Sequence, residues 1–260
     1  MSSAAIECLM SFHLGAGDRD IGLFGRVAPI LVAALWAGAA LWPARANTPA
    51  LTSLPLEQIL ALMEHRDEIQ REGLKHYKAV RQYKVEYRGL ANLDAAMEVE
   101  VDFDATSGKS FRILSQSGSK ILGEKVLKRA MDSEKEASEY SGGTAMTPAN
   151  YRFQLLGSES LDGRPAYILS VEPLKASKFL YRGKVWVDAT DFAVVKAEAT
   201  PAKNPSFLIS RTVIRYTNAK AGDFWLPQQS RSETKVRIGG TAVLTIDYGT
   251  YQILDKAHIR

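Results

Sequence analysis

Two stretches of the chain alternate strictly between apolar and charged positions. Residues 83–88 read Tyr, Lys, Val, Glu, Tyr, Arg, and residues 97–104 alternate Met, Val and Phe with Glu and Asp. A period of two predicts strands with one apolar and one solvated face, as in an antiparallel sheet exposed to water on one side. Residues 109–115 predict a third strand, with Phe111 and Ile113 on one face.

Two segments show the wider spacing of amphipathic helices. Residues 56–77 place apolar side chains in one stripe with a polar break at its middle, and Pro55 suits the first turn of a helix. Residues 121–137 predict a second amphipathic helix. Both helices need a surface to pack against.

From residue 150 to residue 254 the pattern predicts strand after strand. Asp162-Gly163 is a hairpin signal, and Gly239-Gly240 predicts the last hairpin. Sequential hairpins predict one large, curved antiparallel sheet, with two helices to cover it. The expected fold class is therefore α+β.

The N-terminus has the three parts of a secretory signal peptide. Residues 27–42 contain no charge, Arg26 precedes them, and an A-x-A site follows at residues 44–46. The run of 16 residues is short of the roughly 20 that a spanning helix needs, so we expect cleavage after Ala46 rather than a retained membrane anchor. Residues 1–46 are then the signal peptide and residues 47–260 a single periplasmic domain.

Composition gives little support for nucleic-acid binding. The net charge is +4, and no block of five like charges occurs. Cys8 is the only cysteine and lies in the expected signal peptide, so the mature chain should have no disulfide and no cysteine ligand for a metal.

No motif in the chain favours an enzyme. His65 and His76 are expected on the first helix, about three turns apart, which is too far for one metal ion. Residues 108–110 read Gly-Lys-Ser but lack the first glycine of a phosphate loop, so we interpret them as a hairpin turn. The acidic positions in residues 98–104 are interpreted as a solvated strand face rather than a calcium site. We expect no catalysis, no cofactor and no metal.

A curved sheet covered by two helices tends to leave space, and apolar space binds apolar ligands. Periodicity alone leaves this reading and a tightly filled core equally open. The expected lining consists of strand residues together with two residues of the second helix, whose segment 121–131 would act as a plug or lid. These residues are Tyr83, Val85, Tyr87, Met97, Val99, Val101, Phe103, Phe111, Ile113, Leu122 and Val126.

An ordered series of short sequence blocks favours the ligand-binding interpretation over the tightly filled core. The blocks are N-Y-R-F to V-E-P in residues 150–173, G-K-V-W-V-D with D-F-A-V-V in residues 183–195, P-S-F in residues 205–207, F-W-L-P in residues 224–227, and I-D-Y to Tyr in residues 246–251. This series resembles the LolA/LolB-like superfamily of outer-membrane lipoprotein-sorting proteins, over roughly residues 56–254. The resemblance implies a half-open β-barrel wrapped around helices, with a hydrophobic cavity.

The same resemblance implies two alternative functions. The first is a periplasmic carrier or chaperone that binds lipid or lipoprotein acyl chains. The second is an envelope sensor or scaffold module, as in RseB-type domains, that binds an inner- or outer-membrane protein partner. The cargo-site residues of LolA itself are not recognisable here, so the resemblance does not name the cargo.

Overall fold

The computed structural model describes residues 54–139, 145–177, 179–203, 209–237 and 239–256. The expected signal peptide, residues 1–46, lies outside this part of the chain. Within it, no helix is both long and apolar enough to cross a membrane.

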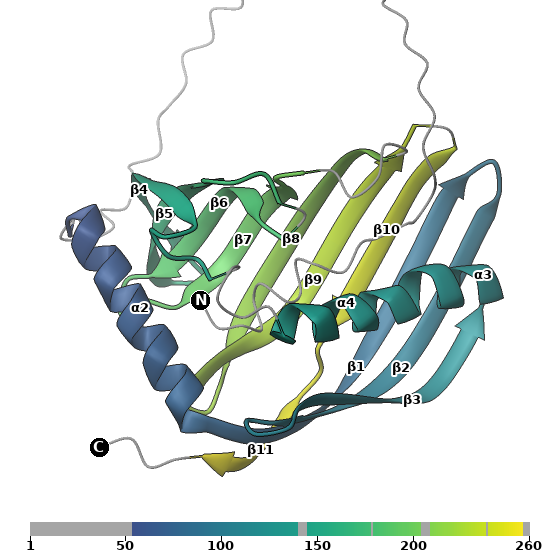
Figure 1. Ribbon diagram of the computed structural model, residues 1–260, viewed down its shortest axis with the longest axis horizontal. Helices are drawn as coiled ribbons and strands as arrows, with labels where there is room; N and C mark the ends of the chain where they lie inside the picture. The colour runs from purple at the N-terminus through teal and green to yellow at the C-terminus, as the bar shows by residue number, and fades with distance from the viewer. Residues whose placement is uncertain (1–53, 140–144, 178, 204–208, 238, 257–260) are drawn as a thin grey trace, which may run out of the picture.

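The described residues form one 11-stranded antiparallel sheet with helices on one side (Figure 1). Along the sheet the order is β3-β2-β1-β10-β9-β8-β7-β6-β5-β4, and β11 pairs with β1. The strands are β1 (Leu74–Gly89), β2 (Asn92–Asp104), β3 (Gly108–Gly118), β4 (Tyr151–Leu161), β5 (Arg164–Pro173), β6 (Tyr181–Asp188), β7 (Val194–Pro201), β8 (Ile209–Ala221), β9 (Phe224–Val236), β10 (Gly240–Asp247) and β11 (Tyr251–Lys256). The expected α+β class, with a large open antiparallel sheet, is confirmed.

The pairing of β1 with β10 joins two hairpin series that are far apart in the sequence. Tyr83 lies opposite Met97 on one side and Ile246 on the other, so all three share one face. This register extends the apolar face of the first three strands into the C-terminal meander. We call this face, on which the helices lie, the concave face, and the opposite face the outer face (Figure 1).

The concave face is covered by two helical segments. The first is α2 (Leu56–Gly73). The second runs without a break through α3 (Lys120–Leu122), a π-helical turn η1 (Gly123–Leu127) and α4 (Lys128–Glu139). Figure 1 shows this second segment, here called the cover helix, crossing the sheet from the end of β3.

The first helix ends four residues earlier than its pattern predicted. The helix stops at Gly73, and residues 74–77 begin β1 instead. Leu74 and Tyr77 are buried there with Phe224 in a small cluster, so burial against the sheet overrides the helical spacing of these residues. His76 consequently lies on β1, which corrects its expected place on the helix.

The segment that follows the predicted hairpin at Gly239-Gly240 is divided into two strands, β10 and β11. Gly249 separates them with a φ of +61°, and a Cβ at this position would lie 2.2 Å from the carbonyl oxygen of Val80. Glycine therefore allows the chain to leave β10 and return beside β1. The turn between β2 and β3 covers residues 105–107, just before the Gly-Lys-Ser segment, which begins β3.

The α2 helix is fixed to the sheet by a buried glutamine. The Gln70 side-chain amide donates to the carbonyl oxygen of Trp225 at 2.9 Å, and its oxygen accepts from the Trp225 backbone N–H at 3.1 Å. One side chain thus satisfies both backbone groups at the start of β9, beneath the helix.

We expect Gln70→Leu to lower the free energy of unfolding by about 2 kcal/mol, because it leaves two buried backbone groups of Trp225 without partners. Gln58→Leu, at an exposed position on the same helix, is the matched control and should change the value by less than about 0.5 kcal/mol. Urea unfolding measures both. Equal effects of the two substitutions would show that the Gln70 hydrogen bonds do not hold α2.

Candidate functional site

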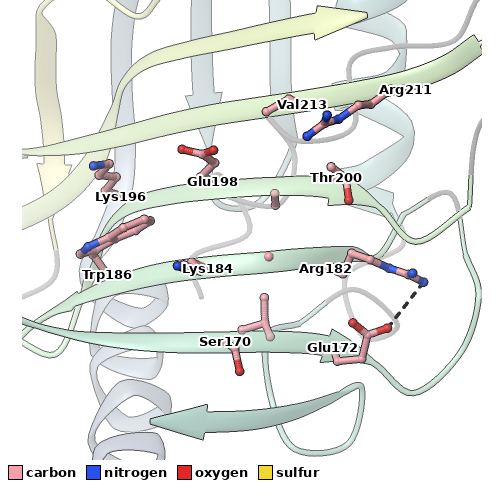
Figure 2. A pocket seen from close by; sticks show the side chains of 13 residues that line it. Ser170, Glu172, Arg182, Lys184, Trp186, Lys196, Glu198, Thr200, Arg211 and Val213 are labelled. Carbon is pink, nitrogen blue, oxygen red and sulfur yellow. Dashed lines mark ion pairs between the residues drawn. The ribbon is translucent and has the colours of Figure 1, made fainter. Parts of the chain in front are cut away.

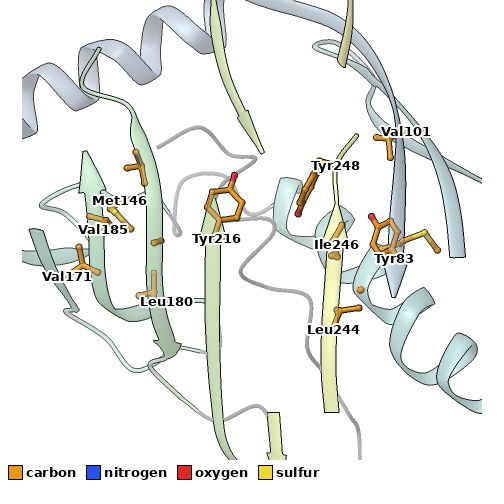
Figure 3. Close-up of a cluster of buried hydrophobic side chains, with 14 of the residues drawn as sticks. Tyr83, Val101, Met146, Val171, Leu180, Val185, Tyr216, Leu244, Ile246 and Tyr248 are labelled. Carbon is orange, nitrogen blue, oxygen red and sulfur yellow. The ribbon is translucent and has the colours of Figure 1, made fainter. Parts of the chain in front are cut away.

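The concave face is apolar on both halves of the sheet. On the N-terminal half, five of the expected lining residues are buried, with exposed fractions of 1% or less; these are Tyr83, Val85, Met97, Val99 and Val101. Figure 3 shows how side chains of β10, such as Leu244 and Ile246, continue this half toward Tyr216 and the β5 and β6 side chains Val171 and Val185. All belong to one hydrophobic cluster.

Three other expected lining residues are less buried than these five. Phe103 is partly buried and stacks on Tyr77 with ring centroids 5.0 Å apart. Phe111 is partly buried opposite Val101. Ile113 lies opposite Val99 on the edge strand β3, with 41% of its surface exposed.

Tyr87 marks the opposite end of the same strands. It is partly buried, and its hydroxyl donates to the carbonyl oxygen of Gly239. This contact ties the β1–β2 hairpin to the turn between β9 and β10.

The cover helix contributes an apolar stripe of its own. Leu122 and Val126, both expected in the lining, are buried against the cluster. Ser119 caps the start of the helix by accepting a hydrogen bond from the backbone N–H of Leu122. Leu127, Ala130 and Met131 complete the buried stripe. The helix is therefore an apolar cover laid on an apolar face.

A charged cluster lies beneath the same helix. Arg81 of β1 is 0% exposed, and its Nη1 donates to both carboxylate oxygens of Glu134 on α4, at 2.9 and 2.8 Å. Lys109 at the start of β3 also donates to Glu134, at 3.0 Å. One buried carboxylate thus joins α4 to β1 and β3, and we call this set the ionic cluster.

The ionic cluster keeps Glu134 charged. Burial alone would raise the pKa of its carboxyl, but the charges of Arg81 and Lys109 and their hydrogen bonds lower the pKa from 4.5 to about 2. The Arg81 guanidinium also lies over the ring of Tyr248, 4.6 Å from its centroid. Among the described residues, the Nε of Arg81 has no hydrogen-bond partner.

Nothing in the sequence pattern singled out this cluster. Arg81 shares the odd-numbered face of β1 with Tyr83 and Val85, so extending the alternation two residues backward would have placed a cation in the core. Glu134 and Lys109 are 25 residues apart in the chain, and no local spacing connects them. The approach of α4 to the sheet brings them together.

Among the polar residues weighed in the sequence, Lys109 belongs to the ionic cluster, whereas the two histidines lie elsewhere. His65 is exposed on α2, and His76 contacts Asp102 on the outer face at 2.7 Å. Asp102 also pairs with Lys78, and Glu100 pairs with Arg112. Two of the four acidic side chains in residues 98–104, Glu100 and Asp102, thus pair with neighbouring cations. The described residues contain no group of three or more His, Cys, Asp or Glu side chains placed to hold a metal ion.

A second feature lies on the outer face. A hollow of about 700 Å³ extends over β5, β6, β7 and β8, on the side of the sheet opposite to the cover helix (Figure 2). It is lined by charged side chains together with Trp186 and Val213. No sequence pattern predicted this hollow, because its residues come together only through the register of four strands.

No protein-family model and no curated protein matches the chain. Among solved structures, a LolA superfamily protein from Nitrosomonas europaea is 15% identical, with 78% of this chain and 95% of that chain covered and a TM-score of 0.38. The chain is similar to LolA superfamily proteins.

Two further structures are similar at the same level. A domain of a putative outer membrane lipoprotein-sorting protein from Vibrio parahaemolyticus is 12% identical, with 78% of this chain and 94% of that chain covered and a TM-score of 0.40. A DUF1329 family protein from Desulfovibrio piger is also 12% identical, with 80% and 96% covered and a TM-score of 0.40.

We expect Glu134→Gln to lower the free energy of unfolding by about 3 kcal/mol at neutral pH, because two buried cations lose their counter-charge. The native carboxyl has a lowered pKa, so its stabilising contribution is complete above pH 4.5 and is lost as the pH falls toward about 2. The stability difference between native protein and variant should therefore shrink over that range. Urea unfolding at a series of pH values measures it.

Asp132→Asn is the matched control, because Asp132 is exposed on the same helix. Its effect should be small at every pH. A Glu134→Gln difference that stays constant down to pH 2.5, roughly, would contradict a charged Glu134 in the native state.

Proposed function

We propose that this protein is a periplasmic carrier or chaperone that binds the acyl chains of a lipid or lipoprotein. One observation carries the proposal. The apolar concave face continues across both halves of the sheet, and the cover helix that lies on it is itself held partly by a charged contact. Such a face gains from any apolar surface laid against it, whether helix or ligand.

The expected lining residues define the binding surface in this proposal. Five of the strand residues among them are buried in the described structure, so an acyl chain gains access by displacing the cover helix; these are Tyr83, Val85, Met97, Val99 and Val101. The acyl chain then occupies the surface of the sheet that Leu122, Val126 and Leu127 cover in the described structure. Burial of apolar area is worth about 25 cal/mol per Å² for either occupant, so the exchange can be nearly balanced.

The ionic cluster sets how firmly the cover is closed. Moving α4 separates Glu134 from Arg81 and Lys109, and water must then solvate all three charges. Because these ion pairs are costly to bury and costly to break, they favour one defined closed position of the cover helix. Release of the ligand then requires the helix to return or a partner to compete for the acyl chain.

The rest of the proposal concerns export. Residues 1–46 act as a signal peptide cleaved after Ala46, and residues 47–260 form the single periplasmic domain. The basic residue, the uncharged run and the A-x-A site support this. A carrier of acyl chains also needs no catalytic group, since its work is done by burial alone.

We expect the purified native protein to carry lipid that organic extraction and mass spectrometry detect, and to bind a fluorescent fatty acid in a saturable manner. Glu134→Ala should increase the association rate of the fatty acid about tenfold, because opening the cover helix no longer breaks the ion pairs with Arg81 and Lys109. Stopped-flow fluorescence measures this rate.

Asp132→Ala, on the exposed side of the same helix, should leave the rate unchanged. A native protein that extracts without lipid and does not bind the fatty acid would contradict the carrier function. Equal rates for Glu134→Ala and the native protein would instead show that the ionic cluster does not control access.

A further inference from the structure

The hollow on the outer face is separate from the proposed acyl-chain site, because the whole thickness of the sheet lies between them. Its side chains come from alternate positions of β5 to β8 that point away from the core (Figure 2). The backbone of Gly183 forms part of its floor, between Val171 and Ala199 of the neighbouring strands.

Strand register arranges these side chains in cross-strand rows. Trp186 lies beside Lys196 in the first row, and Lys184 lies between Ser170 and Glu198 in the second. Arg182 lies beside Thr200 in the third row. Arg211 comes two residues before Val213 along β8 and so forms a fourth row at the end of the hollow.

Each row contributes one cation. From first to fourth these are Lys196, Lys184, Arg182 and Arg211. Successive rows are two residues apart, or about 6.6 Å, so the four cations extend over about 20 Å along the strands. A compact anion such as phosphate could reach only one or two of them.

The hollow carries a positive excess, because its lining has four cations and two carboxylates. Glu172 pairs with Arg182 at 3.5 Å, and Glu198 pairs with Arg215 at 3.4 Å. Lys196 lies over the ring of Trp186, 4.4 Å from its centroid. Within the described chain, no ion pair involves Lys184 or Arg211, so their charges remain available to a ligand.

We propose that this hollow binds an extended acidic peptide segment of a partner protein. In an extended chain, side chains on one face repeat every two residues, or about 6.8 Å, which matches the spacing of the rows. Carboxylates at alternate positions would meet the cations in turn, while Val213 contacts the intervening backbone. Rim charges of this kind speed association and select the partner.

The test uses fluorescein-labelled peptides and the purified full chain. An alternating (Ser-Glu)₄ peptide should bind in a saturable manner, with an affinity that falls as salt is added. The block isomer Ser₄-Glu₄, which has the same composition and charge, should bind about tenfold more weakly because its carboxylates do not match the rows. Fluorescence anisotropy measures both.

Lys184→Ser combined with Arg211→Ser should weaken binding of the alternating peptide about tenfold, since it removes the two cations without ion pairs. Lys84→Ser combined with Arg152→Ser removes two exposed cations outside the hollow and should have little effect. Circular dichroism and urea midpoints show that both variants remain folded.

Three results would overturn the proposal. The first is no saturable binding of the alternating peptide up to about 1 mM. The second is equal affinity for the alternating and block peptides, or equal loss in the two variants. The third is displacement of the peptide by an oligouronate of equal charge, or by anionic phospholipid vesicles, at lower concentration than by unlabelled peptide.

Discussion

An eleven-stranded antiparallel sheet with one apolar face must have that face covered, and the described residues include two helical segments that do so. A long sheet exposes far more surface than a helix of five turns can cover. Each contact beneath the helix is therefore needed to hold the helix on the sheet. The pairing of β1 with β10 makes the requirement stricter, because it joins the apolar faces of two hairpin series into one. The packing of the helices and the proposed acyl-chain site both follow from this single surface.

The buried charges give that cover a defined position. Apolar contacts between Leu127 or Met131 and the sheet are non-directional and would tolerate sliding by part of a turn. Two hydrogen bonds from one guanidinium nitrogen to Glu134 tolerate very little displacement. A buried ion pair adds little net stability compared with an apolar pair of the same size, yet it penalises misplacement severely. The position of the cover helix on the sheet is thereby specific.

Much of the architecture could be predicted from the sequence, for physical reasons that differ between elements. Residues 83–88 and 97–104 follow the period of a half-buried strand closely, so their face and their pairing were predictable. The end of α2 was not, because Leu74 and Tyr77 continue a helical stripe while their burial partners lie about 150 residues away. Arg81 was missed because a charged side chain in an alternating pattern normally marks the solvated face.

The π-helical turn at residues 123–127 has a geometric consequence for the cover helix. The residues that face the sheet, Leu122, Val126, Ala130 and Glu134, recur every four positions, whereas an ordinary helix advances about 100° per residue and would rotate such a series by about 120° over twelve residues. The π-helical turn has more residues per turn than an α-helix, and it therefore offsets much of that rotation. Leu122 and Glu134 can therefore point to the same side. The apolar start of the helix and its charged end thus face the sheet together. Shortening the bulge by a single residue would turn Glu134 away from Arg81 while leaving the first turn in place.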